Sequence, residues 1–214
     1  MSKFKEIGVS KDLCQGINEM GFINPTEVQE KSIPFLLFKN RDLISLAQTG
    51  TGKTAAFGLP VIQKTVLKNK FVQSIILCPT RELCIQICKD FETYSKYVSG
   101  IKILAVYGGA NIETQIKSLN KGVHIVVGTP GRTKDLIKRK VLKLELVDKV
   151  VLDEADEMLS MGFKDDLDFI LERTKSDRQT MLFSATISNE VKSISKRYIC
   201  LPPEWAESTM TLSP

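Results

Sequence analysis

The segment AQTGTGKT, residues 47–54, has the residue types and spacing of a phosphate-binding loop. Gly50 and Gly52 would let successive backbone N–H groups curl around phosphate oxygens, and the helix expected to follow adds its positive N-terminal dipole. The Lys53 ammonium is expected to reach the β- and γ-phosphates, and the Thr54 hydroxyl to bind Mg²⁺. The alternative is an ordinary glycine-rich turn. The nucleotide-binding residues predicted in this loop are Gln48, Thr49, Gly50, Thr51, Gly52, Lys53 and Thr54.

Two acidic residues follow the apolar segment of KVVLDE, residues 149–154, about a hundred residues further along the chain. Asp153 is suited to hold Mg²⁺, directly or through water, and Glu154 is suited to polarise an attacking water. Paired acids alone are more typical of an exposed helix start, but the phosphate loop favours catalysis. We therefore expect Lys53, Asp153 and Glu154 to be catalytic, with Thr54 and Asp153 as metal ligands.

Six apolar segments that alternate with helical patterns are the elements expected to position these residues. The strands are predicted at Leu43–Leu46, Ser74–Cys78, Lys102–Tyr107, His124–Val127, Lys149–Asp153 and Thr180–Phe183. Strands that are apolar on both faces indicate a doubly wound α/β fold, in which helices cover both faces of a mostly parallel sheet. Ligands of such folds gather at the carboxyl ends of the strands.

Two helices are predicted before the first strand. Ser10 is expected to cap a helix that buries Leu13, Ile17 and Met20 on one face and ends at Gly21. A second, short helix is expected after Pro25 and Thr26.

The composition is that of one ordinary globular domain. The chain has 214 residues, of which 43% are hydrophobic and 26% charged, and this excludes a disordered chain, collagen and a coiled coil. The net charge of +5 is too small to prove a polyanionic partner. Five cysteines without a CxxC pair indicate reduced thiols rather than disulfides or zinc. No apolar segment is long enough for a signal core or a membrane span, so we expect a chain of the cytoplasm or nucleus, with the cytoplasm favoured, and no membrane partner. A monomer is also expected.

The acids continue as Asp153-Glu154-Ala155-Asp156, and at this point the sequence resembles the first RecA-like domain of DEAD-box ATP-dependent RNA helicases. The family's motifs lie between residues 4 and 186 in the family's order. They are Phe4, GFINPTEVQ (21–29), AQTGTGKT, PTREL (79–83), Gly108-Gly109, TPGR (129–132), DEAD (153–156) and SAT (184–186). The resemblance implies ATP and Mg²⁺ as cofactors and RNA as a partner.

By this resemblance, Gln29 would read adenine, since its amide can donate to one edge atom of the base and accept from its amino group. Phe22 would stack on the base, and Phe4 would pack against the same pocket. The alternative for both aromatic residues is ordinary core packing. Thr26 would either bond Gln29 or cap the following helix.

The resemblance also implies that three loops bind the backbone of single-stranded RNA without reading its bases. Each loop follows a predicted strand, so the loops would form one surface. Their residues are Pro79, Thr80, Arg81, Gly108, Gly109, Thr129, Pro130, Gly131 and Arg132. For Arg81 and Arg132, an internal salt bridge with an acid such as Glu82 is the alternative. The basic stretch from Lys134 to Lys143 would extend the site or form a solvated helix face, and we favour the solvated face.

Ser184 and Thr186 would couple hydrolysis to unwinding through hydroxyl bonds to Asp156, or would cap the next helix. One departure from the family is Thr133, where many members carry Leu, and we expect it to affect packing more than chemistry.

Three regions are expected along the chain: a helical adenine-recognition segment at 1–40, the RecA-like domain at 41–200, and a tail or linker at 201–214. The family's second RecA-like domain, which carries arginines for phosphoryl transfer, is expected to be absent from this chain. The predicted function is therefore the ATP-binding half of an RNA helicase, nearly inactive by itself. The alternative is a nucleotide-regulated RNA clamp or scaffold, and a third interpretation is a DNA translocase or another P-loop ATPase.

Overall fold

A parallel sheet of seven strands forms the centre of the part of the chain that this computed structural model describes, residues 3–48, 50–200 and 210–211. The strand order is β3-β4-β2-β5-β6-β1-β7, and each neighbouring pair is parallel. The strands are β1 (Leu43–Leu46), β2 (Ser74–Leu77), β3 (Ile103–Val106), β4 (Ile125–Gly128), β5 (Lys149–Leu152), β6 (Gln179–Ser184) and β7 (Met210–Thr211).

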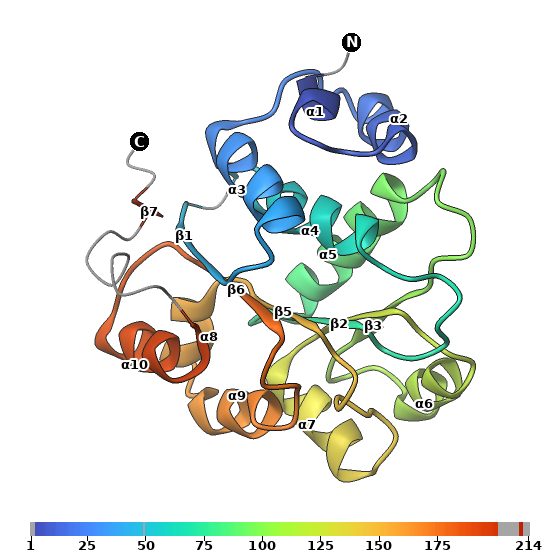
Figure 1. Ribbon diagram of the computed structural model, residues 1–214. Helices are drawn as coiled ribbons and strands as arrows, with labels where there is room; N and C mark the ends of the chain where they lie inside the picture. The colour runs from blue at the N-terminus through green and yellow to red at the C-terminus, as the bar shows by residue number, and fades with distance from the viewer. Residues whose placement is uncertain (1–2, 49, 201–209, 212–214) are drawn as a thin grey trace.

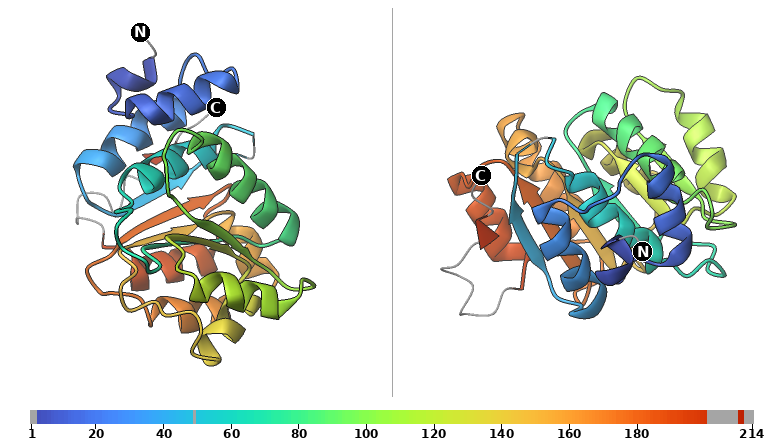
Figure 2. Two further views of the ribbon diagram at one scale, coloured as in Figure 1. Left: turned by 90° about the vertical axis from the view of Figure 1, so that its right-hand side faces the viewer. Right: turned by 90° about the horizontal axis from the view of Figure 1, so that it is seen from above.

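Helices cover both faces of this sheet (Figures 1 and 2). On one side of the sheet, one core is shared by α1 (Lys3–Glu6), α2 (Lys11–Glu19), α3 (Glu27–Phe38), α4 (Lys53–Gln63) and α5 (Arg81–Tyr94), with α1 packed on α2 and α2 on α5. The other side packs against α6 (Ile112–Asn120), α7 (Pro130–Lys138), α8 (Ala155–Ser160), α9 (Lys164–Leu171) and α10 (Asn189–Tyr198). Among the described helices, none is long and apolar enough to cross a membrane.

Alternate residues of the central strands belong to the two cores. In β5, Val151 packs into the core under α1–α5, whereas Val150 and Leu152 pack into the core under α6–α10. In β2, Ile76 packs into the core under α1–α5 and Ile75 into the core under α6–α10. Because a strand with apolar residues on both faces must be covered on both, the predicted doubly wound α/β fold is confirmed.

Five predicted strands match the observed ones within one residue at either end. The strand predicted at His124–Val127 is shifted as a whole by one residue, since β4 runs from Ile125 to Gly128. The tail was expected to carry no strand, and this expectation is wrong at Met210–Thr211, which pairs with Ser45 and Leu46. Without this pairing β1 would be an edge strand, whose free backbone groups accept a further strand. The rest of the predicted tail lies outside the described residues.

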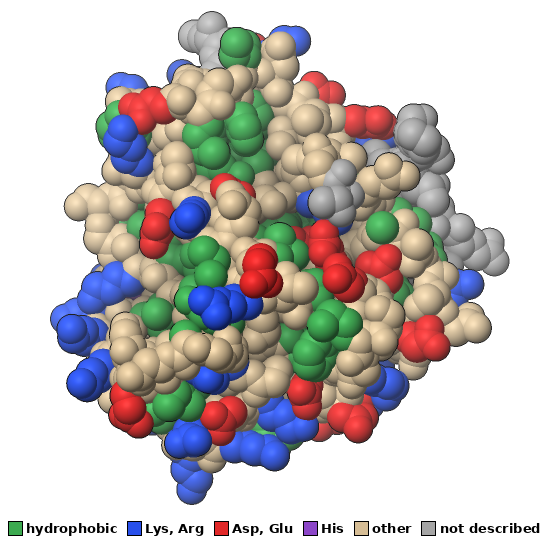
Figure 3. Space-filling model, turned by 180° about the vertical axis from the view of Figure 1, so that it is seen from behind, with side chains coloured by type: hydrophobic (Ala, Val, Ile, Leu, Met, Phe, Trp, Pro, Cys, Tyr) green, Lys and Arg blue, Asp and Glu red, His purple; other side chains and the backbone are tan. Residues whose placement is uncertain are grey.

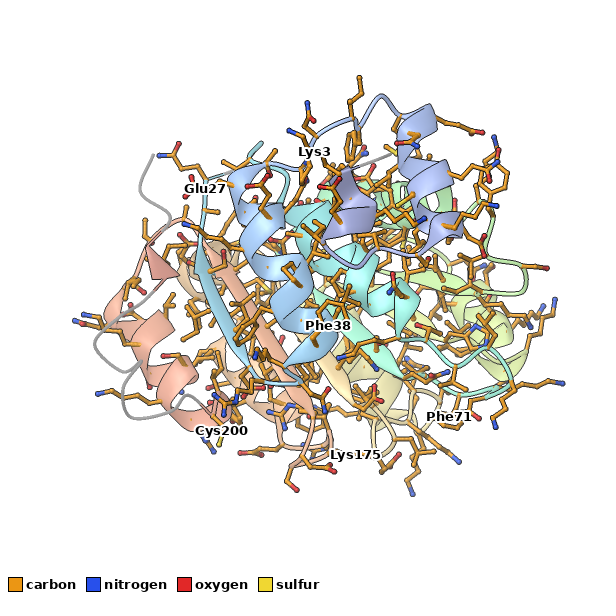
Figure 4. The ribbon with its side chains drawn as sticks, turned by 45° about the horizontal axis from the view of Figure 1, so that its top comes forward. Lys3, Glu27, Phe38, Phe71, Lys175 and Cys200 are labelled. Carbon is orange, nitrogen blue, oxygen red and sulfur yellow. The ribbon has the colours of Figure 1, made fainter. Side chains whose placement is uncertain are left out.

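The N-terminal helices differ in detail from the prediction. Ser10 is the N-cap of α2, but its side chain makes no capping bond, and its N–H donates to Gln63 Oε1 at 2.8 Å. Met20 is 37% exposed and does not share the buried face of Leu13 and Ile17. The helix predicted after Thr26 is not short, since α3 has twelve residues. Figure 4, where Glu27 and Phe38 mark its ends, shows α3 beside α4.

Candidate active site

A cavity of about 240 Å³ lies at the carboxyl ends of β1 and β5. These two strands flank β6, so the loops that follow them meet at one edge of the sheet. Figure 3 shows the face onto which this edge opens, with acidic side chains gathered near its middle. The lining residues are Phe22, Gly50, Gly52, Lys53, Thr54, Ala55, Leu83, Asp90, Tyr94, Asp153 and Glu154.

The loop between β1 and α4 has the backbone of a phosphate cradle. Gly50 has φ +86° and Gly52 has φ +92°, in the left-handed region that favours glycine. Gly52 is the N-cap of α4, so the first N–H groups of this helix face the cavity edge with their positive dipole. The Thr51 hydroxyl donates to the Gln48 carbonyl at 2.8 Å and fixes the turn. The predicted contact of Thr49 lies outside the described residues.

Lys53 is 6% exposed, and its ammonium has no hydrogen-bond partner among the described residues. A buried cation without a partner is costly, and an anion beside it would remove that cost. The cavity at the helix N-terminus, with this ammonium in its wall, therefore fits a polyphosphate.

Asp153 is 2% exposed and faces the same cavity. Its Oδ1 accepts a hydrogen bond from the Glu154 N–H at 3.1 Å. Burial raises the pKa of Asp153 to about 6, and the charge of Lys53 opposes this rise. Carboxylate and hydroxyl oxygens are the ligands that Mg²⁺ prefers, so Asp153 and Thr54, which line one cavity, fit this ion.

Glu154 also lines the cavity, and its backbone lies in the left-handed region with φ +53°. This conformation is uncommon for a residue other than glycine, and residues that adopt it cluster at functional sites, although Asn40 and Lys140 adopt it away from this cavity. The side chain also bonds Glu157, whose pKa is raised by that hydrogen bond. A carboxylate beside Asp153 in this cavity is placed to accept a proton from water.

Asp156 contacts the end of β6, as predicted. The Thr186 N–H and hydroxyl both donate to Asp156 Oδ2, at 3.0 and 2.8 Å, and the Ser184 hydroxyl donates to the Thr186 carbonyl at 2.7 Å. Burial acts to raise the pKa of Asp156, but the hydrogen bonds from the Thr186 hydroxyl and N–H outweigh it and hold that pKa below its usual value. The helix-capping alternative is wrong, because Ser188 caps α10.

Gln29 contacts the phosphate loop rather than open space. It is 2% exposed, and its Nε2 donates to the Gly52 carbonyl at 3.0 Å. Its Oε1 accepts from the Thr26 N–H at 2.9 Å, and the Thr26 hydroxyl donates to the Thr51 carbonyl at 2.9 Å. Thr26 therefore fills both predicted roles, as N-cap of α3 and as partner of Gln29. Adenine recognition by Gln29 stays a prediction, and it would use the second hydrogen of Nε2 and the second lone pair of Oε1 or require the present bonds to open.

The two aromatic residues assigned to the base have different surroundings. Phe22 is half-buried, lines the cavity and lies 6.3 Å from the Tyr94 ring, centroid to centroid. Phe4 is fully buried in the core. Phe4 therefore has the role given as the alternative, ordinary core packing, because it has no exposed surface that a ligand could contact.

Three lining residues of α5 were missed by the sequence analysis. Leu83, Asp90 and Tyr94 recur at spacings of seven and four, which places them on one helix face. That spacing was readable in the sequence, but only the packing of α5 against α2 and α4 directs this face into the cavity. Burial raises the pKa of the Asp90 carboxyl and of the Tyr94 hydroxyl.

The three predicted RNA loops form one connected surface at the carboxyl edge of the sheet. Thr80 caps α5 and accepts from the Leu83 N–H at 3.2 Å. The exposed Arg81 guanidinium lies 5.1 Å from the centre of the Tyr107 ring, next to the exposed pair Gly108 and Gly109.

Arg132 links the third loop to the second. Its Nη1 donates to the Ala110 carbonyl and to Gln115 Oε1, both at 3.1 Å, and Gln115 Nε2 donates to the Tyr107 carbonyl at 3.2 Å. The salt bridge considered for the two arginines is not among the ion pairs of the described chain. Arg132 therefore holds the loop that contains Gly108 and Gly109 in position.

The remaining loop residues differ in exposure. Gly131 is exposed and Thr129 is half-buried, so both can be reached by a ligand. Pro79 and Pro130 are buried, so the predicted direct contact of these two prolines is corrected to a role in loop shape. Thr133 is also fully buried, and its hydroxyl has no hydrogen-bond partner among the described residues. Its burial agrees with the expected effect on packing.

Comparison with known proteins gives consistent results. A family model described as DEAD/DEAH box helicase matches residues 26–194. The chain is 50% identical over 202 residues to "ATP-dependent RNA helicase CshA" of Listeria monocytogenes and 47% identical over 202 residues to "DEAD-box ATP-dependent RNA helicase CshA" of Geobacillus kaustophilus. Each alignment covers 94% of this chain, which spans 38% and 43% of the length of these relatives.

A solved structure described as a DEAD box protein from the hyperthermophile Methanococcus jannaschii superposes with a TM-score of 0.87 at 43% sequence identity. The match covers 92% of this chain and 53% of the other. The RecA-like arrangement of strands and helices is therefore shared with that protein.

Proposed function

Because the chain belongs to the DEAD/DEAH box helicase family, we propose that it is the ATP-binding half of an ATP-dependent RNA helicase. In the whole protein, ATP binding and hydrolysis would be coupled to RNA binding and to local separation of a duplex. The observation that carries this proposal is the buried, unpartnered ammonium of Lys53 beside the buried carboxylate of Asp153, within the described part of the chain.

In this proposal, the chain's own groups bind and orient the triphosphate. The Lys53 ammonium and the first N–H groups of α4 hold the phosphates, and Phe22 covers the base. Thr54 and Asp153 would hold Mg²⁺, which when bound would neutralise charge on the phosphate oxygens. Glu154 accepts a proton from the attacking water.

The transferring phosphoryl group also needs positive charge in the transition state, and an arginine supplied from elsewhere contributes roughly 10³ to 10⁵ in rate. We assign that arginine to a second RecA-like domain of the whole protein, since relatives are much longer than this chain. The chain alone should then bind nucleotide but hydrolyse it little.

RNA would lie across the three loops at the carboxyl edge of the sheet. Arg81 supplies charge, while the exposed Gly108, Gly109 and Gly131 allow close approach of a sugar-phosphate backbone. Such contacts do not depend on base identity. The bonds from Thr186 to Asp156 connect the end of β6 to the DEAD segment, which makes them a route from the nucleotide to the rest of the protein.

We further propose that the protein acts as a monomer in the cytoplasm. The described cysteines form no disulfide, and four of them, Cys14, Cys78, Cys84 and Cys88, are buried, which supports a reducing compartment.

Calorimetric titration with Mg²⁺ and ATP tests the proposed site. Wild-type chain should bind ATP, Lys53→Ala should not, and Lys192→Ala, which removes an exposed charge on α10, should bind as wild type does. Equal binding by Lys53→Ala would remove the basis of the proposal. Robust RNA-stimulated hydrolysis by the 214-residue chain would instead show that no second domain is needed.

A further inference from the structure

Three cationic side chains converge on the ring of Phe169, a half-buried residue of α9. The Lys134 and Lys138 ammonium groups of α7 lie 5.5 and 5.7 Å from the ring centroid, and the Arg173 guanidinium lies 3.4 Å from it. Arg173 Nη1 also donates to the Phe169 carbonyl at 2.6 Å, which holds this guanidinium in place. We call Phe169, Lys134, Lys138 and Arg173 the Phe169 cluster.

The Phe169 cluster has more positive than negative charge. In the described part of the chain, its one ion pair joins Lys134 Nζ to Asp166 Oδ1 at 2.5 Å. Lys138 and Arg173 are exposed and take part in none of the described ion pairs. Because one ring gathers cations that repel one another, an anion beside them would be favoured.

The cluster also continues the proposed RNA surface. Helix α7 begins at Pro130 in the third RNA loop, and a Cβ on Gly131 would lie 3.8 Å from Asp166 Oδ2, the carboxylate that pairs with Lys134. Lys138 follows Gly131 by seven residues, which is about 10 Å along a helix. A stacked strand carries one phosphate per roughly 3.4 Å, so this distance corresponds to about three nucleotides.

We propose that the Phe169 cluster binds the phosphodiester backbone of an RNA strand where it leaves the loop 129–132, and thereby lengthens the RNA site along α7. This inference rests on the proposed RNA-binding function. It replaces the interpretation of Lys134 and Lys138 as part of a solvated helix face. RNA is the occupant that fits, because the cluster is contiguous with the exposed Gly131 of the proposed RNA surface and presents the exposed cations Lys138 and Arg173.

The test compares the double variant Lys138→Ala/Arg173→Ala with the control Lys192→Ala/Lys196→Ala, which removes the same charge from exposed positions of α10. Anisotropy of labelled oligouridylates would be measured at about 50 mM salt, with strands of about five and about twenty nucleotides. The first variant should bind the long strand about three- to tenfold more weakly than wild type and the short strand equally well. Its salt slope on the long strand should fall by about 1.4, for two lost phosphate contacts.

The other outcomes separate this inference from the function on which it rests. If both double variants lose the same affinity for the long strand, or if neither loses any, the Phe169 cluster is not an RNA site. Arg81→Ala should weaken binding of both strands, since it lies on the central surface. If wild type binds neither strand, the proposed RNA function is wrong, and the extension fails with it. Circular dichroism would confirm that each variant is folded.

Discussion

Replacing Gly52 with alanine tests the connection between α3 and the phosphate loop. Gly52 has φ +92°, and a Cβ built there would lie 2.4 Å from Gln29 Nε2 and 3.1 Å from Thr26 Oγ1. The alanine methyl group cannot occupy this space unless the Gln29 amide leaves. We therefore expect Gly52→Ala to break the bonds of Gln29 to the Gly52 carbonyl and to the Thr26 N–H.

The expected loss of stability has two parts. Holding alanine in the left-handed region costs about 1–2 kcal/mol. Losing two hydrogen bonds of Gln29, each with a net contribution of about 0.5–1.5 kcal/mol, adds roughly 1–3 kcal/mol. The total of about 2–5 kcal/mol should lower Tm by roughly 4–20 °C for a chain of this length.

Gly50→Ala is the matched control. Gly50 has φ +86°, but a Cβ there would have no heavy atom within 4 Å, so only the backbone strain applies. Urea unfolding followed by circular dichroism, without nucleotide, should place the free energy of unfolding of Gly52→Ala about 1–3 kcal/mol below that of Gly50→Ala. In Gly52→Ala/Gln29→Ala the clash is absent, so the two substitutions should be non-additive by a similar amount. Equal losses in the two alanine variants together with full additivity would refute the connection.

Further expectations follow from two hydrogen bonds of the site and from Asp42, a buried carboxyl group outside it. Arg132→Lys keeps the charge but cannot hold both of its acceptors, so amide hydrogen exchange in residues 108–111 should accelerate about tenfold, whereas unchanged rates would contradict the positioning role. Thr186→Val removes one donor to Asp156 and should lower the free energy of unfolding by about 1–2 kcal/mol in urea titrations while ATP binding persists. Burial raises the pKa of Asp42, so the folded state binds this proton more tightly than the unfolded state. The stability of wild type relative to Asp42→Asn should therefore increase as pH falls from 7 through the raised pKa, and a constant difference would contradict this assignment.

The fold could be predicted from the sequence because its strands are apolar on both faces. Val150 and Val151 need partners on opposite sides of the sheet, and only helices on both faces supply them. The phosphate and metal residues could be predicted for a related reason. Asp153 directly follows the buried strand β5, and Lys53 follows the loop after β1, so the topology brings both residues to one edge of the sheet.

Contacts between distant elements could not be predicted in this way. The sequence offers no local signal that Arg132 donates to the Ala110 carbonyl rather than to a phosphate or an acid. Likewise, an aromatic side chain near the N-terminus packs equally well in a core or in a pocket, and only the packing of α1 beside α2 in the first core buries Phe4 completely. Both outcomes depend on contacts between elements that are distant in the sequence, and local residue type and spacing do not reveal such contacts.

The two ends of the nucleotide site differ in how ready they are for a ligand. At the phosphate end, the Lys53 ammonium has no partner within the described chain, so an incoming anion replaces no protein hydrogen bond. At the base end, the Gln29 amide already bonds Gly52 and Thr26. A contact of this buried amide with a base would use its remaining hydrogen and lone pair or displace these bonds, and displaced bonds would reduce its net contribution to affinity. In either case base recognition by Gln29 is tied to the phosphate loop, because the same amide bonds the Gly52 carbonyl.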